Sequence, residues 1–175
     1  MKLTAIAAAL SLAVLTHAFP AAADDDGASL KFRGGIGVDP VSSGQGTAAT
    51  ATVVNRNIVR GVQPPGQLWV ISDLKAEIDL NSGSVRVDGR GLLLAGGNTI
   101  GTNANQSVRA TLICDLPVGT TNPPLFDSGL VPLEADGDFR IDDTLSPRPP
   151  AVCASPVLLI RNPAGAWFAA GILKR

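Results

Sequence analysis

The sequence contains little of what nucleic-acid-binding proteins and many enzymes rely on. Of its 175 residues one is histidine and none is tyrosine, and aromatic residues make up only 4% of the chain. The formal net charge is −1, so the basic excess expected of a nucleic-acid binder is missing. So few aromatic rings also argue against stacking platforms for bases or sugars. We therefore predict no nucleic-acid partner. The hydrophobic share of 45% is nevertheless enough for a folded core.

The first 23 residues have the order of a secretory signal peptide. Lys2 supplies a positive charge, residues 3–15 form a nearly unbroken apolar run, and three alanines at 21–23 offer a cleavage site. The run is shorter than the roughly 20 residues of a transmembrane helix, which argues against an uncleaved anchor. We predict cleavage after Ala23, with Ala18 as a weaker alternative site. The protein would then be secreted or periplasmic, and the exported part has no further transmembrane segment.

Loss of this leader would remove His17, the single histidine. A chain without histidine excludes Ser-His-Asp and Cys-His catalysis and histidine-bearing zinc sites. The exported part keeps 13 basic and 15 acidic residues, a formal net charge of −2. Its glycine-rich segments at 34–37 and 96–101 lack the spacing of phosphate-binding or dinucleotide-binding loops, and no cofactor is predicted.

Cys114 and Cys153 are the two cysteines of the chain. Both lie in the exported part, and an oxidising compartment favours a structural disulfide between them. The alternative is a reactive pair, which usually uses Cys-x-x-Cys spacing or a neighbouring base, and neither is present.

The exported part is patterned as short strands. Residues 74–80 and 84–90 alternate apolar and charged side chains around the turn 81–83, which predicts a β-hairpin with one buried and one charged face. A short helix at 70–79 is a minor alternative. Further strands are predicted at 30–36, 50–59, 108–114, 128–134, 139–142, 157–160 and 166–172, with hairpin turns at 135–138 and 162–165.

These roughly eight strands and the turns between them predict one all-β domain spanning residues 30–175. The expected architecture is an antiparallel β-sandwich, Ig-like in general arrangement, or a small barrel-like domain. Residues 24–29 are predicted to be a flexible acidic lead-in.

No metal site is predicted. The weak candidates for calcium ligands are Asp136, Asp138, Asp142 and Asp143. Calcium prefers several carboxylate oxygens in one loop, but the closing bidentate acid of an EF-hand is missing here. The favoured interpretation is a hairpin turn with solvated acids.

Trp69 and Trp167 are the candidates for a binding surface, although core or rim packing is the favoured interpretation of both. The rings at 167 and 168 would point to opposite faces of a strand, one into the core and one partly exposed. Recognition is also expected from loops carried by a rigid β domain. The predicted contact loops are Val38–Ala49, Asn98–Gln106 and Val118–Phe126.

Several segments together resemble a group of small secreted bacterial proteins of unknown function. They are residues 32–41, 59–66, 85–94, 107–114, 156–162 and 166–171, and they span most of the exported part. The resemblance implies export and the cysteine pair, and it implies no activity.

The leading functional hypothesis is an exported, non-catalytic binding or surface-interaction module with an unknown ligand. One alternative is an extracellular hydrolase that uses paired carboxylates. The acids available to it are Asp73, Glu77, Asp79, Asp88 and Glu134. A second alternative is an envelope or structural protein that self-associates through an exposed edge strand.

Overall fold

The computed structural model describes residues 28–38, 57–115 and 123–174. The predicted signal peptide, most of the acidic lead-in, nearly all of loop 38–49 and residues 50–56 of one predicted strand lie outside these residues. Within them there is no α-helix, and every strand pairing is antiparallel, which confirms the all-β prediction. None of the described segments forms a helix long and apolar enough to cross a membrane.

Eleven strands are formed by the described residues. They are β1 (Ser29–Gly37), β2 (Trp69–Val70), β3 (Asp73–Asp79), β4 (Ser84–Arg90), β5 (Leu93–Leu94), β6 (Ser107–Ile113), β7 (Leu125–Asp127), β8 (Val131–Pro132), β9 (Phe139–Thr144), β10 (Val157–Arg161) and β11 (Trp167–Lys174).

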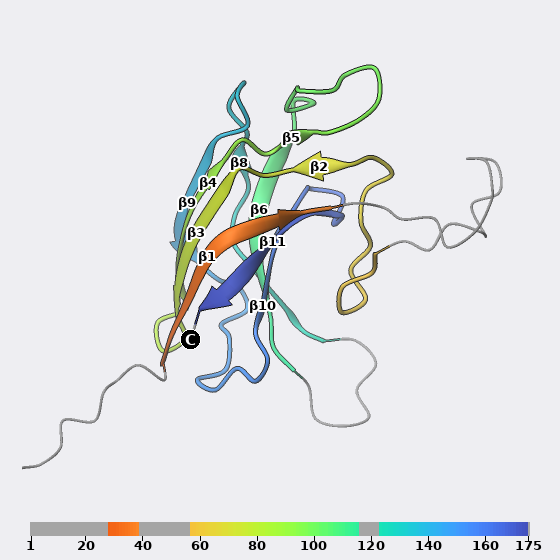
Figure 1. Ribbon diagram of the computed structural model, residues 1–175. Helices are drawn as coiled ribbons and strands as arrows, with labels where there is room; N and C mark the ends of the chain where they lie inside the picture. The colour runs from red at the N-terminus through yellow and green to blue at the C-terminus, as the bar shows by residue number, and fades with distance from the viewer. Residues whose placement is uncertain (1–27, 39–56, 116–122, 175) are drawn as a thin grey trace, which may run out of the picture.

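Nine of these strands form one continuous curled sheet. Its order is β7-β6-β10-β11-β1-β3-β4-β9, with β8 paired to β6, while β2 and β5 form a small second sheet. The sheet is curled, and its strands wrap around a common interior (Figure 1). The curled antiparallel sheet has the form of a half-barrel, and the predicted Ig-like sandwich stays a prediction.

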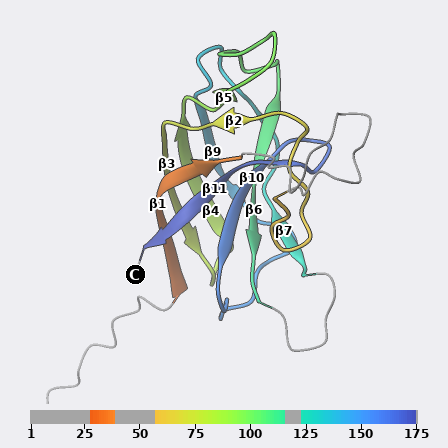
Figure 2. The same cartoon turned by 45° about the vertical axis from the view of Figure 1, so that its right-hand side comes forward.

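The ends of the curled sheet are joined at one place, which we call the seam. The N–H of Asp127, at the end of β7, donates to the carbonyl of Ser146 at 3.0 Å. The N–H of Ser146, two residues after β9, donates back to the carbonyl of Asp127 at 2.8 Å. Figure 2 shows β7 lying beside β6 on this side of the molecule. The seam therefore ties the two outermost strands of the order to each other.

The predicted hairpin at 74–90 is confirmed as β3 and β4. Leu74, Ala76 and Ile78 are buried, while the charged residues between them are exposed or half-buried. The register sets Glu77 opposite Arg86, so the charged face pairs opposite signs. The minor alternative of a helix at 70–79 is excluded.

The predicted pairing of 128–134 with 139–142 is wrong, although the turn between them forms. The N–H of Gly137 donates to the carbonyl of Glu134 at 2.9 Å, which closes the turn. However, β8 pairs with β6, and β9 pairs with β4 over six residues. The buried Phe139 and Ile141 align with the buried face of β4.

The predicted disulfide between Cys114 and Cys153 is present. It joins the residue after β6 to the loop that leads into β10. Arg60 reinforces this end of the sheet, because its guanidinium pairs with Asp115 and donates to the carbonyl of Ser155 at 3.1 Å.

Candidate functional site

Both tryptophans are buried, so neither ring is available as a surface platform. Trp69 stacks on Phe168 with ring centroids 4.0 Å apart, and the indole N–H of Trp167 donates to the carbonyl of Asn57 at 2.9 Å. The expectation that one ring at 167–168 is partly exposed is corrected, since both are buried. The reason is that the chain before β3 packs against these two rings: the carbonyl of Gln63 accepts from the N–H of Trp167, and Trp69 stacks on Phe168.

The four calcium candidates do not converge. Asp138 accepts from the N–H of Gly91, Asp143 accepts from the N–H of Gly129, and Asp142 forms an ion pair with Arg86. Asp136 accepts from the N–H of Asp138 within the turn. Nowhere in the described residues do three acidic, cysteine or histidine side chains gather as a metal site would require.

One predicted contact loop, Asn98–Gln106, is described and lines a hollow of about 700 Å³. Asn103 anchors it, because its side-chain amide donates to the carbonyls of Leu133 and Glu134 at 3.0 and 2.8 Å. The hollow offers small neutral side chains, mostly hydroxyl and amide groups. It has a defined shape but no charged or aromatic group that would anchor a ligand.

Two of the acids considered for hydrolysis, Glu77 and Asp79, line a second hollow of about 400 Å³ together with Arg86. The backbone N–H groups of Ser82 and Asn81 lower the pKa of Asp79, because they donate to its carboxylate. Asp79 is therefore ionised at neutral pH and stabilises the turn, which does not suit a general acid.

The other acids considered for hydrolysis lie apart from this hollow. Asp73 forms an ion pair with Lys75 at 3.4 Å, and Asp88 lies 4.0 Å from Arg140. Glu134 is exposed beside the turn at 135–138.

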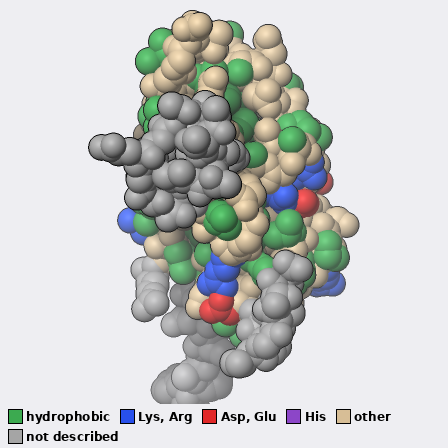
Figure 3. All heavy atoms as spheres, turned by 90° about the vertical axis from the view of Figure 1, so that its right-hand side faces the viewer, with side chains coloured by type: hydrophobic (Ala, Val, Ile, Leu, Met, Phe, Trp, Pro, Cys, Tyr) green, Lys and Arg blue, Asp and Glu red, His purple; other side chains and the backbone are tan. Residues whose placement is uncertain are grey.

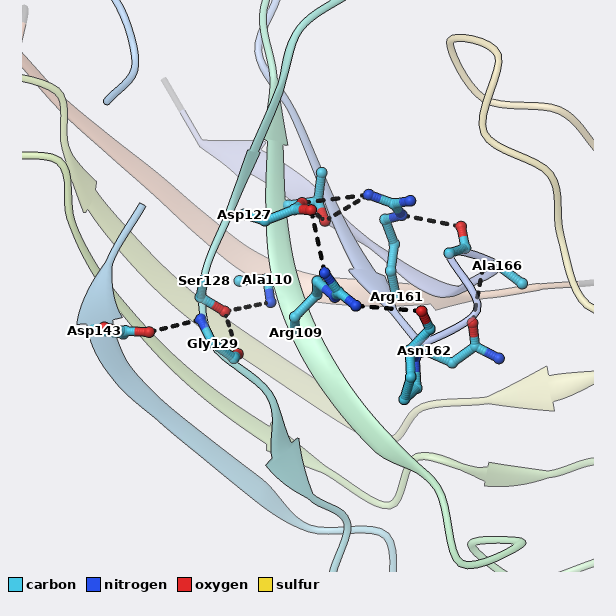
Figure 4. Close-up of polar contacts among 12 residues, drawn as sticks. Arg109, Ala110, Asp127, Ser128, Gly129, Asp143, Arg161, Asn162 and Ala166 are labelled. Atoms are coloured by element: carbon cyan, nitrogen blue, oxygen red, sulfur yellow. Dashed lines mark hydrogen bonds and ion pairs between the residues drawn. The ribbon is translucent and has the colours of Figure 1, made fainter. Parts of the chain in front are cut away.

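A group of charged side chains from β6, β7 and β10 lies next to the seam. Arg109 on β6 and Arg161 on β10 are directly opposite each other in the register of these strands. Thr111 on β6 is directly opposite Asp127 on β7. Figure 4 shows both guanidinium groups turned toward the carboxylate of Asp127. We call Arg109, Thr111, Asp127 and Arg161 the seam cluster.

The Asp127 carboxylate holds the seam cluster together. Its Oδ1 accepts from the Thr111 hydroxyl at 2.6 Å and from Arg161 Nη1 at 3.3 Å, and its Oδ2 accepts from Arg109 Nη1 at 3.5 Å. The arginines are also held from the far side, where Arg161 Nε donates to the carbonyl of Gly165 at 3.0 Å and Arg109 Nη2 donates to that of Pro163 at 3.3 Å. Three strands and one turn therefore fix both guanidinium groups.

The seam cluster carries more positive than negative charge, and it has more hydrogen-bond donors than acceptors. Two guanidinium groups share one carboxylate, which leaves a formal charge of +1. Burial lowers the pKa of Arg161, the Asp127 carboxylate opposes this shift, and the nearby Arg109 adds to it. The Nε of Arg109 is buried and has no hydrogen-bond partner among the described residues.

The seam cluster is within reach of solvent. The side chains of Arg109 and Asp127 are 24% and 26% exposed, and that of Arg161 is 11% exposed. Figure 3 shows small groups of charged side chains of both signs on one face of the molecule, amid hydrophobic and neutral side chains. Partial burial strengthens the attraction of these guanidinium groups for an anion compared with fully hydrated ones.

The seam cluster was missed by the sequence analysis. Its signal was present, because Arg109 interrupts an apolar strand and Arg161 closes the apolar run 157–160. The 51 residues between the two arginines hid their pairing, which depends on strand order rather than on local pattern. Comparisons with protein-family models, curated proteins and solved structures find no match for this chain.

Proposed function

We propose that the chain is an exported, non-catalytic, barrel-like β domain that binds a carboxylate-bearing ligand at the seam cluster. The observation that carries the proposal is the register pair Arg109–Arg161, which sets two cations directly opposite each other with one carboxylate between them. Like charges directly opposite in a sheet are destabilising. The repulsion between the two arginines would be offset if their function is to bind the carboxylate of a ligand.

Guanidinium groups suit this role because their planar donors match the two oxygens of a carboxylate. Both arginines lie on strands rather than on loops, and the bonds to Pro163 and Gly165 hold their side chains. A ligand carboxylate would meet donors that are already oriented, which reduces the entropy lost on binding. Asp127 would act as the internal counter-ion of the empty site.

The test is calorimetric titration of the exported protein with citrate at neutral pH, with glycerol as the uncharged control ligand. We expect saturable binding of citrate and none of glycerol. Arg109→Gln should weaken citrate binding by about tenfold or more, since one charge-assisted hydrogen bond is worth roughly 1.5–3 kcal/mol. Arg86→Gln is the matched control, because it removes the same charge from another part of the sheet.

Asp127→Asn separates a binding role from a structural role. Removing the internal carboxylate frees both guanidinium groups for the ligand, so citrate should bind more tightly even though the variant is less stable. If citrate binding is absent in the wild type, or is equally weakened by Arg86→Gln, the proposal is wrong. The seam cluster would then serve only to hold the sheet together.

A further inference from the structure

A second charged surface lies on the outer face of β1, β3 and β11, away from the seam cluster on β6, β7 and β10. The register sets Lys31 directly opposite Lys174 and sets Arg33 directly opposite Lys75. Lys31 and Arg33 are two residues apart on β1 and therefore share one face. All four side chains are exposed, and we call them the basic face.

The positive charge of the basic face is concentrated on β1 and β11, which carry Lys31, Arg33 and Lys174 and no acidic residue. The acids that face these cations come from β3 and β4. Asp73 pairs with Lys75 at 3.4 Å, Asp88 lies opposite Lys75, Glu77 lies opposite Lys31, and Asp79 shares the outer face of β3. On β4 and β9 the signs alternate instead, with Arg86 set against Asp142 and Asp88 set against Arg140.

A bulge places apolar side chains beside these cations. Between the pairs Phe32–Leu173 and Gly35–Gly171, two residues of β1 lie opposite one residue of β11, and Gly34 adopts a positive φ of 83°. That single residue is Ile172, which is two residues from Lys174 and so lies on the same face.

Two isoleucines are exposed on this outer face. Ile172 is 40% exposed and Ile36 is 59% exposed. Ile36 is paired with Ala170, which is again two residues along β11 from Ile172 and on the same face. Figure 1 shows β1, β3 and β11 side by side on the near side of the sheet. The surface thus combines four cations with two exposed aliphatic side chains.

We propose that this surface docks onto a lipid bilayer that carries anionic headgroups. The four cations match the negative surface potential of such a bilayer, and the two isoleucines reach the boundary between headgroups and acyl chains. Charge complementarity selects an anionic surface, and the exposed isoleucines favour a bilayer over a purely hydrophilic polyanion. The two like-charge pairs across the strands are relieved when headgroup phosphates come between them.

The test is vesicle flotation of the exported protein, whose N-terminus is first checked by mass spectrometry, since the apolar run 3–15 would itself bind lipid. Vesicles of phosphatidylcholine are compared with vesicles that also contain phosphatidylglycerol. We expect binding only to the anionic vesicles, and a decline in this binding as salt is added.

Matched variants locate the docking surface. Lys31→Gln combined with Lys174→Gln should reduce partitioning about 25-fold, or about fivefold for each cation removed. Arg86→Gln combined with Arg140→Gln removes the same charge from the alternating surface and should leave partitioning within about twofold of the wild type. Equal losses in the two double variants would overturn the proposal.

The aliphatic contribution has its own control. Ile36→Ser combined with Ile172→Ser should weaken vesicle binding severalfold, whereas Ile100→Ser combined with Val152→Ser removes exposed aliphatic side chains elsewhere and should not. Failure to bind anionic vesicles, or binding to heparin with none to vesicles, would overturn the proposal. Because the seam cluster is not part of this surface, citrate binding should be the same in all four double variants.

Discussion

At the scale of single residues, Asp127 has two structural roles, one for its backbone and one for its side chain. Its backbone closes the seam through Ser146, and its side chain neutralises one charge of the pair Arg109–Arg161. The side chain of Arg161 is only 11% exposed, so water compensates little for a lost partner. The stability of the seam and the electrostatics of the proposed binding site therefore depend on the same carboxylate.

Asp127→Ala should consequently lower the free energy of unfolding by about 2–3 kcal/mol, because it leaves two partly buried cations facing each other and removes three hydrogen bonds. Urea denaturation measures the change. Asp142→Ala is the control, since it breaks only the exposed pair with Arg86 and should cost less than about 1 kcal/mol. Similar losses in the two variants would contradict this account of Asp127.

Asp79 gives a prediction about pH. The N–H groups of Ser82 and Asn81 lower its pKa below the ordinary value of 3.8, so the charged carboxylate stabilises the folded turn. This contribution is complete well above pH 3.8 and is lost as pH falls through the folded-state pKa below that value. The stability difference between wild type and Asp79→Asn should therefore shrink on acidification, measured by urea denaturation from neutral to strongly acidic pH. A difference that stays constant would contradict the assignment.

At the scale of elements, local pattern predicted most of the strands but few of their partners. The alternation at 74–90 predicted β3, β4 and their pairing, because a short turn leaves a hairpin no other local partner. The strands β6, β10 and β11 were predicted by their apolar residues. The pairing of β9 with β4 was not predicted, since 48 residues separate Arg90 from Phe139 and nothing local specifies their contact.

The pairing of β4 with β9 depends on one glycine. A Cβ at Gly89 would lie 2.1 Å from the buried ring of Phe139, the residue opposite it on β9. Gly89→Ala should therefore destabilise the fold by about 1–3 kcal/mol, because the ring must move within a packed interior. Gly66→Ala is the control, since no atom lies within 4 Å of its added Cβ. Thermal unfolding of both variants tests the prediction, and equal melting temperatures would contradict it.

The residues of the two proposed binding surfaces were less predictable than the strands for the same reason. Arg109 and Arg161 each look like an ordinary charged residue at a strand position. Lys31 and Lys174 look like the exposed charges of two separate strands. They become pairs only through the contacts β6–β10 and β1–β11, the second of which joins the two ends of the described chain. The sequence shows that these residues are charged, but it does not show which of them lie opposite one another in the sheet.

At the scale of the whole molecule, the fold closes through the disulfide and the seam together. The bond between Cys114 and Cys153 spans a sequence separation of 39 residues. Chain entropy assigns a loop of this length about 4 kcal/mol of stabilisation. Replacing both cysteines by serine should therefore lower the free energy of unfolding by up to that amount, measured by urea denaturation. A loss below about 1 kcal/mol would show that the remaining contacts close the fold without it.

The central claim is that the paired arginines beside the seam bind a carboxylate. The most direct measurement follows the Arg109 and Arg161 Nε–H signals by nuclear magnetic resonance while citrate is added to the protein without its predicted signal peptide. Both signals should move along saturable curves with one shared affinity, and the signal of Arg86 should stay in place. Signals of Arg109 and Arg161 that do not move, or that move no more than that of Arg86, would contradict the account.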